Sequence, residues 1–262
     1  MNRTPPRARR TLVTLVAAVL LLSLGAVPAR ADHAPGDPLE GFNRAIFKFN
    51  DKLDTWVLAP AAKGWDFVIP SGMQESIENF FENVSFPIDF LNSVLQAKPK
   101  RAGIVLGRFT INTVFGVVGL FDPAEAAGLE PVHEDFGQTL GRWGLGGGPY
   151  LVLPVLGPSN IRDGVGRGVD SFTRVWPWFV DWYVSMGVTA VDTVNWRALN
   201  LELIGDLKRD SLDYYAAVRD AYLQRRADLI ADRLGGENED KPGTQDEDEL
   251  YYPDEESDQP HD

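Results

Sequence analysis

Hydrophobic and polar positions follow the period of an α-helix through most of the chain. The clearest run lies between residues 39 and 60, where large apolar side chains recur every three or four residues: Phe42, Ile46, Phe49, Leu53 and Trp56. This spacing places them on one face of a helix. Because the residue before a proline disfavours the helical conformation, we expect this helix to end at Pro60.

The same periodicity predicts several further short helices. Their expected ranges are 71–84, 88–97, 100–122, 188–207 and a last helix that closes at Gly235. Ser71 is the expected N-cap of the first of these, and Asp210 or Ser211 that of the last. Few segments alternate with the period of a strand. The sequence therefore predicts an all-α fold of many short amphipathic helices, with no linker that divides it.

An uncharged apolar run at residues 143–161 interrupts this pattern. Its length is close to that of a membrane-spanning helix, about 20 residues. Five glycines and three prolines in the run are incompatible with an ordinary helix, so we expect an irregular, hairpin-like path. Bare backbone is tolerated at membrane depth only where protein or a cavity covers it, which favours a channel-lining loop. An apolar loop inside a soluble core is the alternative.

Charge and composition exclude several function classes. The net charge of −13 leaves no basic face for nucleic acid, so we expect no nucleic-acid partner. The sequence contains no cysteine, which excludes disulfides, thiolate metal sites, a cysteine nucleophile and a cysteine-linked lipid anchor within it. The many aromatic residues suit an interfacial membrane protein as well as a soluble core.

The two ends of the sequence differ from the part between them. Residues 1–31 combine arginines, an apolar stretch and an Ala29-Arg30-Ala31 cleavage pattern, which predicts a signal peptide. Residues 235–262 hold twelve acidic residues and one lysine, which predicts a disordered acidic tail. We therefore expect one folded domain over 32–234.

The candidate catalytic motifs are weak. His133, Glu134 and Asp135 are adjacent, but a metal site needs three or four converging ligands, so capping or surface roles are favoured. The segment 164–168 lacks the strand and spacing of a dinucleotide loop. Ser159 lies outside any nucleophile-elbow motif and is more typical of a turn or cap. We expect neither an enzyme nor a cofactor.

Several blocks of sequence, in order, resemble the MlaA/VacJ family of outer-membrane proteins. They are DPLEGFNR from residue 37, ENFFENVSFPIDFLNSVLQAKP, GRFTINTVFGVVGLFDPA, EDFGQTLGRWGLGGGPYLVLPVLGPSNIRD and YAAVRDAYLQRR. Together they cover about residues 37–226. Family members are usually lipoproteins with an acylated cysteine, which this sequence lacks.

The resemblance implies a flat ring of short helices at the periplasmic face of the outer membrane. In this family a central amphipathic channel passes mislocalised phospholipids from the outer leaflet to a periplasmic shuttle, MlaC, without covalent chemistry. Trimeric porins are the usual partners. The alternatives are a porin-associated scaffold that carries no lipid, and a periplasmic phospholipase.

Motif positions give the expected channel and lipid-binding residues. Three lie in the helix near the channel wall, five in the apolar loop, and three are arginines that could contact phosphate or, equally, pair with nearby acids. They are Asn79, Phe80 and Phe81; Tyr150, Leu151, Val152, Leu153 and Pro154; and Arg108, Arg142 and Arg162. We expect a charge added at Leu151 or Leu153 to impair lipid passage without unfolding the protein.

Overall fold

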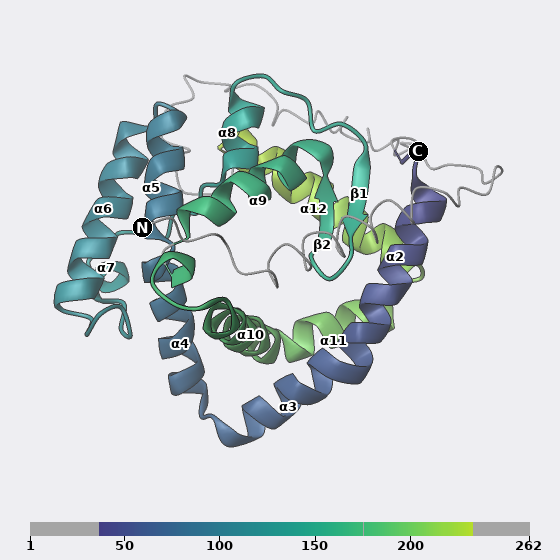
Figure 1. Cartoon of the computed structure of the whole chain (residues 1–262), viewed down its shortest axis with the longest axis horizontal. Coiled ribbons are helices and arrows are strands. Elements are labelled where there is room, and N and C mark those ends of the chain that lie inside the picture. The colour runs from purple at the N-terminus through teal and green to yellow at the C-terminus, as the bar shows by residue number, and fades with distance from the viewer. Residues whose placement is uncertain (1–36, 175, 233–262) are drawn as a thin grey trace, which may run out of the picture.

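The computed structural model describes residues 37–174 and 176–232, so the predicted signal peptide and acidic tail lie outside the described residues. Figure 1 shows α4, α5 and α6 on one side, α3 and α2 on the other, and α8, α9, α12 and the two-stranded hairpin across the top, with α10 and α11 inside this outline. The helical elements are α2 (Glu40–Leu53), a π-helical turn η1 (Asp54–Leu58), α3 (Ala59–Val68), α4 (Ser71–Val84), α5 (Phe86–Leu95), α6 (Pro99–Val114), α7 (Pro123–Ala126), α8 (Phe136–Arg142), α9 (Ile161–Thr173), a 3-10 turn η2 (Trp176–Trp178), α10 (Trp182–Leu199), α11 (Leu201–Asp210) and α12 (Tyr214–Ile230). The all-α prediction is confirmed, with the strands β1 (Tyr150–Leu153) and β2 (Gly157–Asn160) as a small addition.

The expected end of the first helix at Pro60 is wrong. The π-helical turn η1 joins α2 to α3, and Pro60 lies in the first turn of α3. The amide of Ala59 bonds to the carbonyl of Asp54, five residues back, which is the wider π pattern. The π-helical turn before Pro60 interrupts the regular hydrogen-bond pattern, so a residue without an N–H is tolerated within the continuing helix.

Two expected N-caps are also wrong. Ser71 is the first residue of α4, which Pro70 precedes. The last helix begins later than expected, because Asp213 caps it by accepting a hydrogen bond from the amide of Ala216. An aspartate closer to the helix satisfies the free amides of the first turn better than Asp210 can.

The helix predicted over 100–122 ends at Val114. A turn follows, in which Val117 and Val118 adopt positive φ angles and the amide of Gly119 bonds to the carbonyl of Asn112 at 2.9 Å. Gly119, at φ 91°, lies so close to Asn83 of α4 that a Cβ would clash with it. This packing of the turn against α4, which periodicity does not register, stops the helix.

The hairpin-like path of the apolar run is confirmed. β1 and β2 pair antiparallel, with Tyr150 opposite Asn160 and Leu153 opposite Gly157. Two asparagines of α2 bind the open edge of β1: Asn43 bonds to the Tyr150 carbonyl and the Val152 amide at 2.9 Å. Asn50 accepts from the Val155 amide at 2.8 Å. Side-chain amides thus take the place of a third strand.

The buried and exposed residues reverse the usual arrangement of a soluble protein. The apolar core of Tyr150, Val152 and Tyr215 is small, while many buried residues are polar or charged. Large apolar side chains lie on the surface, among them Phe67 at 90% and Phe179 at 82% exposed. Extensive exposed apolar surface marks a contact with membrane or protein. Among the described residues, every helix is too short or too polar to cross a bilayer.

An ion-pair hub joins α8, α9 and α12. Arg226 of α12 contacts the carboxylates of Asp135 at 2.5 Å and Asp163 at 2.8 Å, and Tyr222 donates to Asp163. Burial would raise the pKa of both aspartates, but hydrogen bonds and the positive charge of Arg226 outweigh it and lower both. Gly166 lets α9 approach Gly137 so closely that a Cβ would clash. The hub holds α8, α9 and α12 together, and residues of these three helices line a polar chamber that they share with α4, α5 and α10.

Candidate functional site

A polar chamber of about 810 Å³ lies between α4, α5, α8, α9, α10 and α12. Its lining includes Phe81 and Ile88, but most of the lining residues are polar or charged. The chamber brings together segments from residue 78 to residue 225. Its size is that of a ligand-binding cavity.

Carboxylates dominate one part of the chamber wall. Five of them have a pKa raised above the ordinary range, and burial is the largest cause for each: Glu78, Glu82, Asp89, Asp170 and Asp192. Burial disfavours the charged form of a carboxylate unless cations compensate it. The chamber therefore presents acidic groups that the fold itself does not fully neutralise.

Three arginines also line the chamber, and their environments differ. Arg167 donates to the carbonyls of Leu156 and Pro158 at 3.0 and 2.9 Å, which ties the hairpin turn to α9. Arg225 of α12 is exposed and makes no hydrogen bond or ion pair with the described part of the chain. Arg225 is thus a guanidinium free to bind an anion. The third of these arginines is Arg174.

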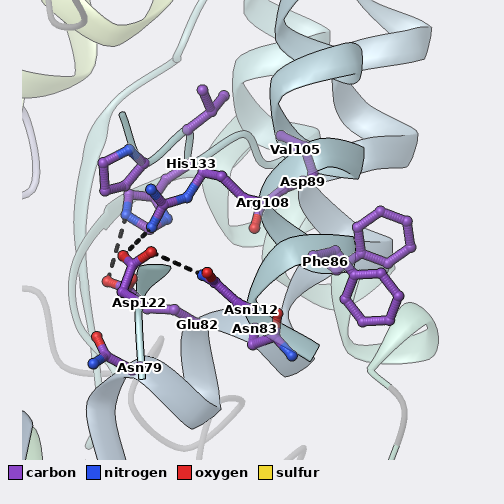
Figure 2. Close-up of a pocket in the computed structure, with 13 residues that line it drawn as sticks. Asn79, Glu82, Asn83, Phe86, Asp89, Val105, Arg108, Asn112, Asp122 and His133 are labelled. Atoms are coloured by element: carbon purple, nitrogen blue, oxygen red, sulfur yellow. Dashed lines mark hydrogen bonds and ion pairs between the residues drawn. The ribbon is translucent and has the colours of Figure 1, made fainter. Parts of the chain in front are cut away.

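A small side pocket of about 40 Å³ adjoins the chamber, with which it shares Glu82, Asp89 and His133 (Figure 2). Arg108 of α6 contacts Asp122 at 2.5 Å, and Asn112 donates to the same carboxylate at 2.9 Å. Figure 2 shows Arg108 and Asn112 both directed at Asp122. The ion pair holds the turn after α6 against the helix.

Two apolar cavities lie against the other faces of α10. The first, the Arg197 cavity, has a volume of about 370 Å³ and lies between α2, η1, α10, α11, α12 and the hairpin. The second, the Met186 groove, has a volume of about 460 Å³ and lies between η1, α3 and α10. The two share Val57, Leu58 and Thr193.

Residues of α10 and of the hairpin turn separate the polar chamber from these apolar cavities. Trp196 lines both the chamber and the Arg197 cavity, and Thr189 lines both the chamber and the Met186 groove. In the hairpin turn, Leu156 faces the chamber and Val155 the Arg197 cavity. A polar and an apolar compartment are therefore adjacent across single side chains.

Comparison with known proteins gives one consistent result. Residues 35–229 match the family model described as MlaA lipoprotein. The chain belongs to the MlaA family. It is 38% identical over 205 residues to the intermembrane phospholipid transport system lipoprotein MlaA of Escherichia coli K12, covering 77% of this chain and 80% of that protein. The protein of the same name from Haemophilus influenzae is 38% identical over 195 residues, 72% of this chain and 76% of that protein.

A solved structure has the same fold. It comes from work on the structural basis for maintenance of bacterial outer membrane lipid asymmetry and superposes with a TM-score of 0.66 at 37% identity. The match covers 74% of this chain and 98% of the solved one. The family assignment predicted from the sequence blocks is confirmed by both comparisons.

Two of the three predicted residues of α4 line cavities of this MlaA fold, and the third packs against one of them. Phe81 lines the chamber and Asn79 the side pocket. The ring of Phe80 packs edge-on against that of Phe81 at 5.6 Å. Their role in lipid contact stays a prediction.

The three predicted arginines all have partners. Arg108 pairs with Asp122, Arg162 with Asp163 at 2.9 Å, and Arg142 with Asp232 at 3.1 Å. Arg108 and Arg162 are also buried. The contacts of these arginines in the structure are therefore the ion pairs with nearby acids that were the alternative to phosphate binding. Phosphate binding by these arginines stays a prediction.

The predicted hairpin residues lie beside the cavities rather than on their walls. Tyr150 and Val152 are buried in the core against α12, and Leu151, Leu153 and Pro154 are half-buried. None of the five lines the chamber, side pocket, Arg197 cavity or Met186 groove formed by the described residues. Alternation along β1 points Tyr150 and Val152 into the core. The residues that line the cavities are those of the apolar turn after β1, Val155 and Leu156.

The motifs considered for catalysis have structural roles. Asp135 caps α8 by accepting from the Gln138 amide at 2.7 Å, and Glu134 is buried with Lys98 and Arg101. Ser159 is fully buried, and its hydroxyl donates to the Asn160 carbonyl. The part of the chain that the structure describes contains no group of residues able to hold a metal ion.

Sequence reasoning missed three residues that the structure places at the cavities. Trp196, Arg197 and Arg225 lie on helices whose existence was predicted, but their inward direction depends on tertiary packing. A polar residue within an apolar helical segment, as at Arg197, was the available signal.

Proposed function

We propose that this protein moves phospholipids within the bacterial cell envelope through its chamber and the adjoining apolar cavities. The supporting observation is that the polar chamber and the two apolar cavities are adjacent, separated by side chains of α10. A phospholipid has a polar headgroup and two apolar tails, and burying either in the wrong environment is unfavourable. The chamber suits the headgroup, and the Arg197 cavity and Met186 groove suit the tails.

The chamber chemistry supports headgroup binding. Arg225, which has no hydrogen-bond or ion-pair partner among the described residues, offers guanidinium donors for a phosphate, and the acidic wall suits an ammonium group. The route then takes mislocalised phospholipid from the outer leaflet of the outer membrane toward the periplasm. The step involves no covalent chemistry. It needs no ATP motif, because exchange down a difference in lipid packing or affinity drives it.

The exposed apolar side chains support residence in the outer membrane at its periplasmic face. Exposed Phe67 and Phe179 would be covered by lipid or by a trimeric porin. A periplasmic MlaC-like lipid-binding protein would receive the lipid.

Transfer of labelled phospholipid tests this function. Vesicles that carry the full chain and a fluorescent phospholipid are incubated with the purified shuttle protein. We expect the shuttle to acquire label at least about tenfold faster than from protein-free vesicles. Binding to a trimeric porin without any transfer would instead support the alternative of a porin-associated scaffold.

A further inference from the structure

The chamber contains more carboxylates than the fold neutralises. Glu134 pairs with Lys98 and Arg101. Asp135 pairs with Arg226. In contrast, the five chamber carboxylates whose pKa is raised by burial form no ion pair with a lysine or arginine in the part of the chain that the structure describes. A cation that enters the chamber would therefore stabilise their charged forms.

One of these five carboxylates is deeply buried and has an oxygen without a partner. Asp89 of α5 is 9% exposed and lines both the chamber and the side pocket. Its Oδ1 atom accepts a hydrogen bond from the Glu134 amide at 3.0 Å, whereas Oδ2 accepts none from the described residues and is not enclosed by them. Leaving such an acceptor unpaired is unfavourable. The free oxygen therefore indicates a ligand that donates hydrogen bonds.

Two further carboxylates are held close together on α4 and α10. The side chain of Asn195 donates to the Gln74 carbonyl at 2.9 Å, which joins the two helices. Glu78 and Asp192 lie one turn away from this bond, and the charge of Asp192 contributes to the raised pKa of Glu78. A cation near both would relieve this repulsion. Trp196, one turn from Asp192 on α10, also lines the chamber, and the face of an indole ring attracts cations.

Glu82 joins these carboxylates into one acidic surface. Its negative charge contributes to the raised pKa of both Glu78 and Asp89, so the surface extends from α10 through α4 to α5. An ammonium group would bring this surface a positive charge and N–H donors. A phosphate would be repelled by it and suits Arg225 of α12 instead, which is exposed and has no partner among the described residues.

We propose that the chamber selects phospholipids whose headgroup carries an ammonium, such as phosphatidylethanolamine, over anionic phospholipids such as phosphatidylglycerol. The ammonium binds the acidic surface that contains Glu78, Asp89 and Asp192, and the phosphate binds on the side of Arg225. An anionic headgroup brings no cation to this surface and adds a negative charge to a chamber that already has unpaired ones. This inference rests on the proposed transport function and adds to it the class of headgroup.

Paired lipids test the headgroup class without changing the protein. Phosphatidylethanolamine and phosphatidylglycerol with the same acyl chains compete against a fluorescent phosphatidylcholine bound to the full chain in uncharged detergent. We expect phosphatidylethanolamine to bind about tenfold more tightly, since a hydrogen bond between charged groups has about this effect. Equal affinity, or tighter binding of phosphatidylglycerol, would overturn the headgroup preference while leaving transport intact. Binding of neither lipid would contradict both proposals.

A soluble amine is another source of the same chemistry. Glycerophosphoethanolamine has the same headgroup as phosphatidylethanolamine and no acyl chains. We expect it to displace the fluorescent lipid at least about a hundredfold more weakly, because burial of the acyl chains supplies much of the binding free energy of a lipid. Displacement at concentrations similar to those of the lipid would assign the chamber to a free amine and overturn the proposal.

Variants assign the preference to the acidic surface. Asp89→Asn removes the charge but keeps an oxygen that can accept the backbone hydrogen bond, and it should lower the preference at least about threefold. If Asp89→Asn does not fold, Glu78→Gln combined with Asp192→Asn provides the test, because neither residue has an ion pair to lose in the described part of the chain. The control, Glu202→Gln combined with Asp206→Asn, removes two charges from exposed positions of α11 and should retain the preference. An unchanged preference in the folded chamber variants, or an equal loss in the control, would overturn the proposal.

Discussion

Two aspartates of α9, seven residues apart, show how the hub differs from the chamber. Asp163 and Asp170 are both buried, yet the pKa of Asp163 is lowered and that of Asp170 is raised. Asp163 binds Arg226 and Arg162, while Asp170 accepts hydrogen bonds from two neutral groups, the Asn92 side chain and the Phe136 amide. At Asp170 the effect of burial on the pKa outweighs these hydrogen bonds and the positive charge of Arg174.

This difference distinguishes carboxylates that stabilise the fold from carboxylates that are available to a ligand. In the hub, each carboxylate has a cation that belongs to the protein, so no charge is left for a ligand. In the chamber, the carboxylates and Arg225, which has no ion-pair partner in residues 37–174 and 176–232, can bind groups that come from outside. The same residue types therefore serve stability in one region and recognition in the other.

Breaking the hub should have the largest effect on stability. Asp163→Asn leaves Arg226 and Arg162 without their shared carboxylate, and removing one partner of a buried ion pair costs about 3–5 kcal/mol. Denaturant unfolding monitored by circular dichroism measures the loss. Asp192→Asn in the chamber is the matched control, and an equal loss there would contradict the distinction between the two regions.

Charging the hairpin turn should impair transport without unfolding the protein. Val155→Asp adds a charge where the turn faces the Arg197 cavity, and we expect transfer to the shuttle to fall at least about tenfold, because an apolar tail must pass it. Leu153→Asp should have a smaller effect, since Leu153 is half-buried beside the cavities. The reverse order, with circular dichroism unchanged for both, would refute the assignment of the turn as the lipid-facing segment.

The chamber carboxylates should have a small effect on stability whose sign depends on pH. Burial raises the pKa of Asp192, so its contribution favours the fold at acidic pH and is lost as the pH rises through the raised pKa. Asp192→Asn should therefore stabilise the protein by about 1 kcal/mol or less at pH 8. The difference should vanish near pH 4, and denaturant unfolding at the two pH values measures it. Destabilisation at pH 8 would show that Asp192 has a structural partner after all.

Much of the architecture could be predicted from the sequence, because local forces determine it. Apolar periodicity identified the helices, and the glycines and prolines of residues 143–161 identified the hairpin. The continuation through Pro60 was not predictable, since it depends on the π pattern of η1. That pattern forms where Asp54 can meet Arg197, which is 143 residues away in sequence.

The candidate site could be predicted only in outline. The sequence blocks pointed to α4 and to the hairpin, and both border the cavities. The particular residues depend on packing: strand alternation turns Tyr150 and Val152 into the core, while Val155 and Leu156 in the turn reach the cavities. Some arginine partners also come from distant segments, as Asp232 does for Arg142, so Arg142 and Arg225 could not be told apart from their sequence context.

The absence of cysteine allows a direct test of the central claim that phospholipid passes through the chamber. Thr189→Cys places one thiol where the chamber meets the Met186 groove, and Glu202→Cys places one on the exposed part of α11. Each variant is reacted with a bulky maleimide, and transfer of labelled phospholipid to the shuttle is compared before and after. We predict that modification abolishes transfer for Thr189→Cys and leaves it unchanged for Glu202→Cys. Undiminished transfer by fully modified Thr189→Cys would contradict passage through the chamber.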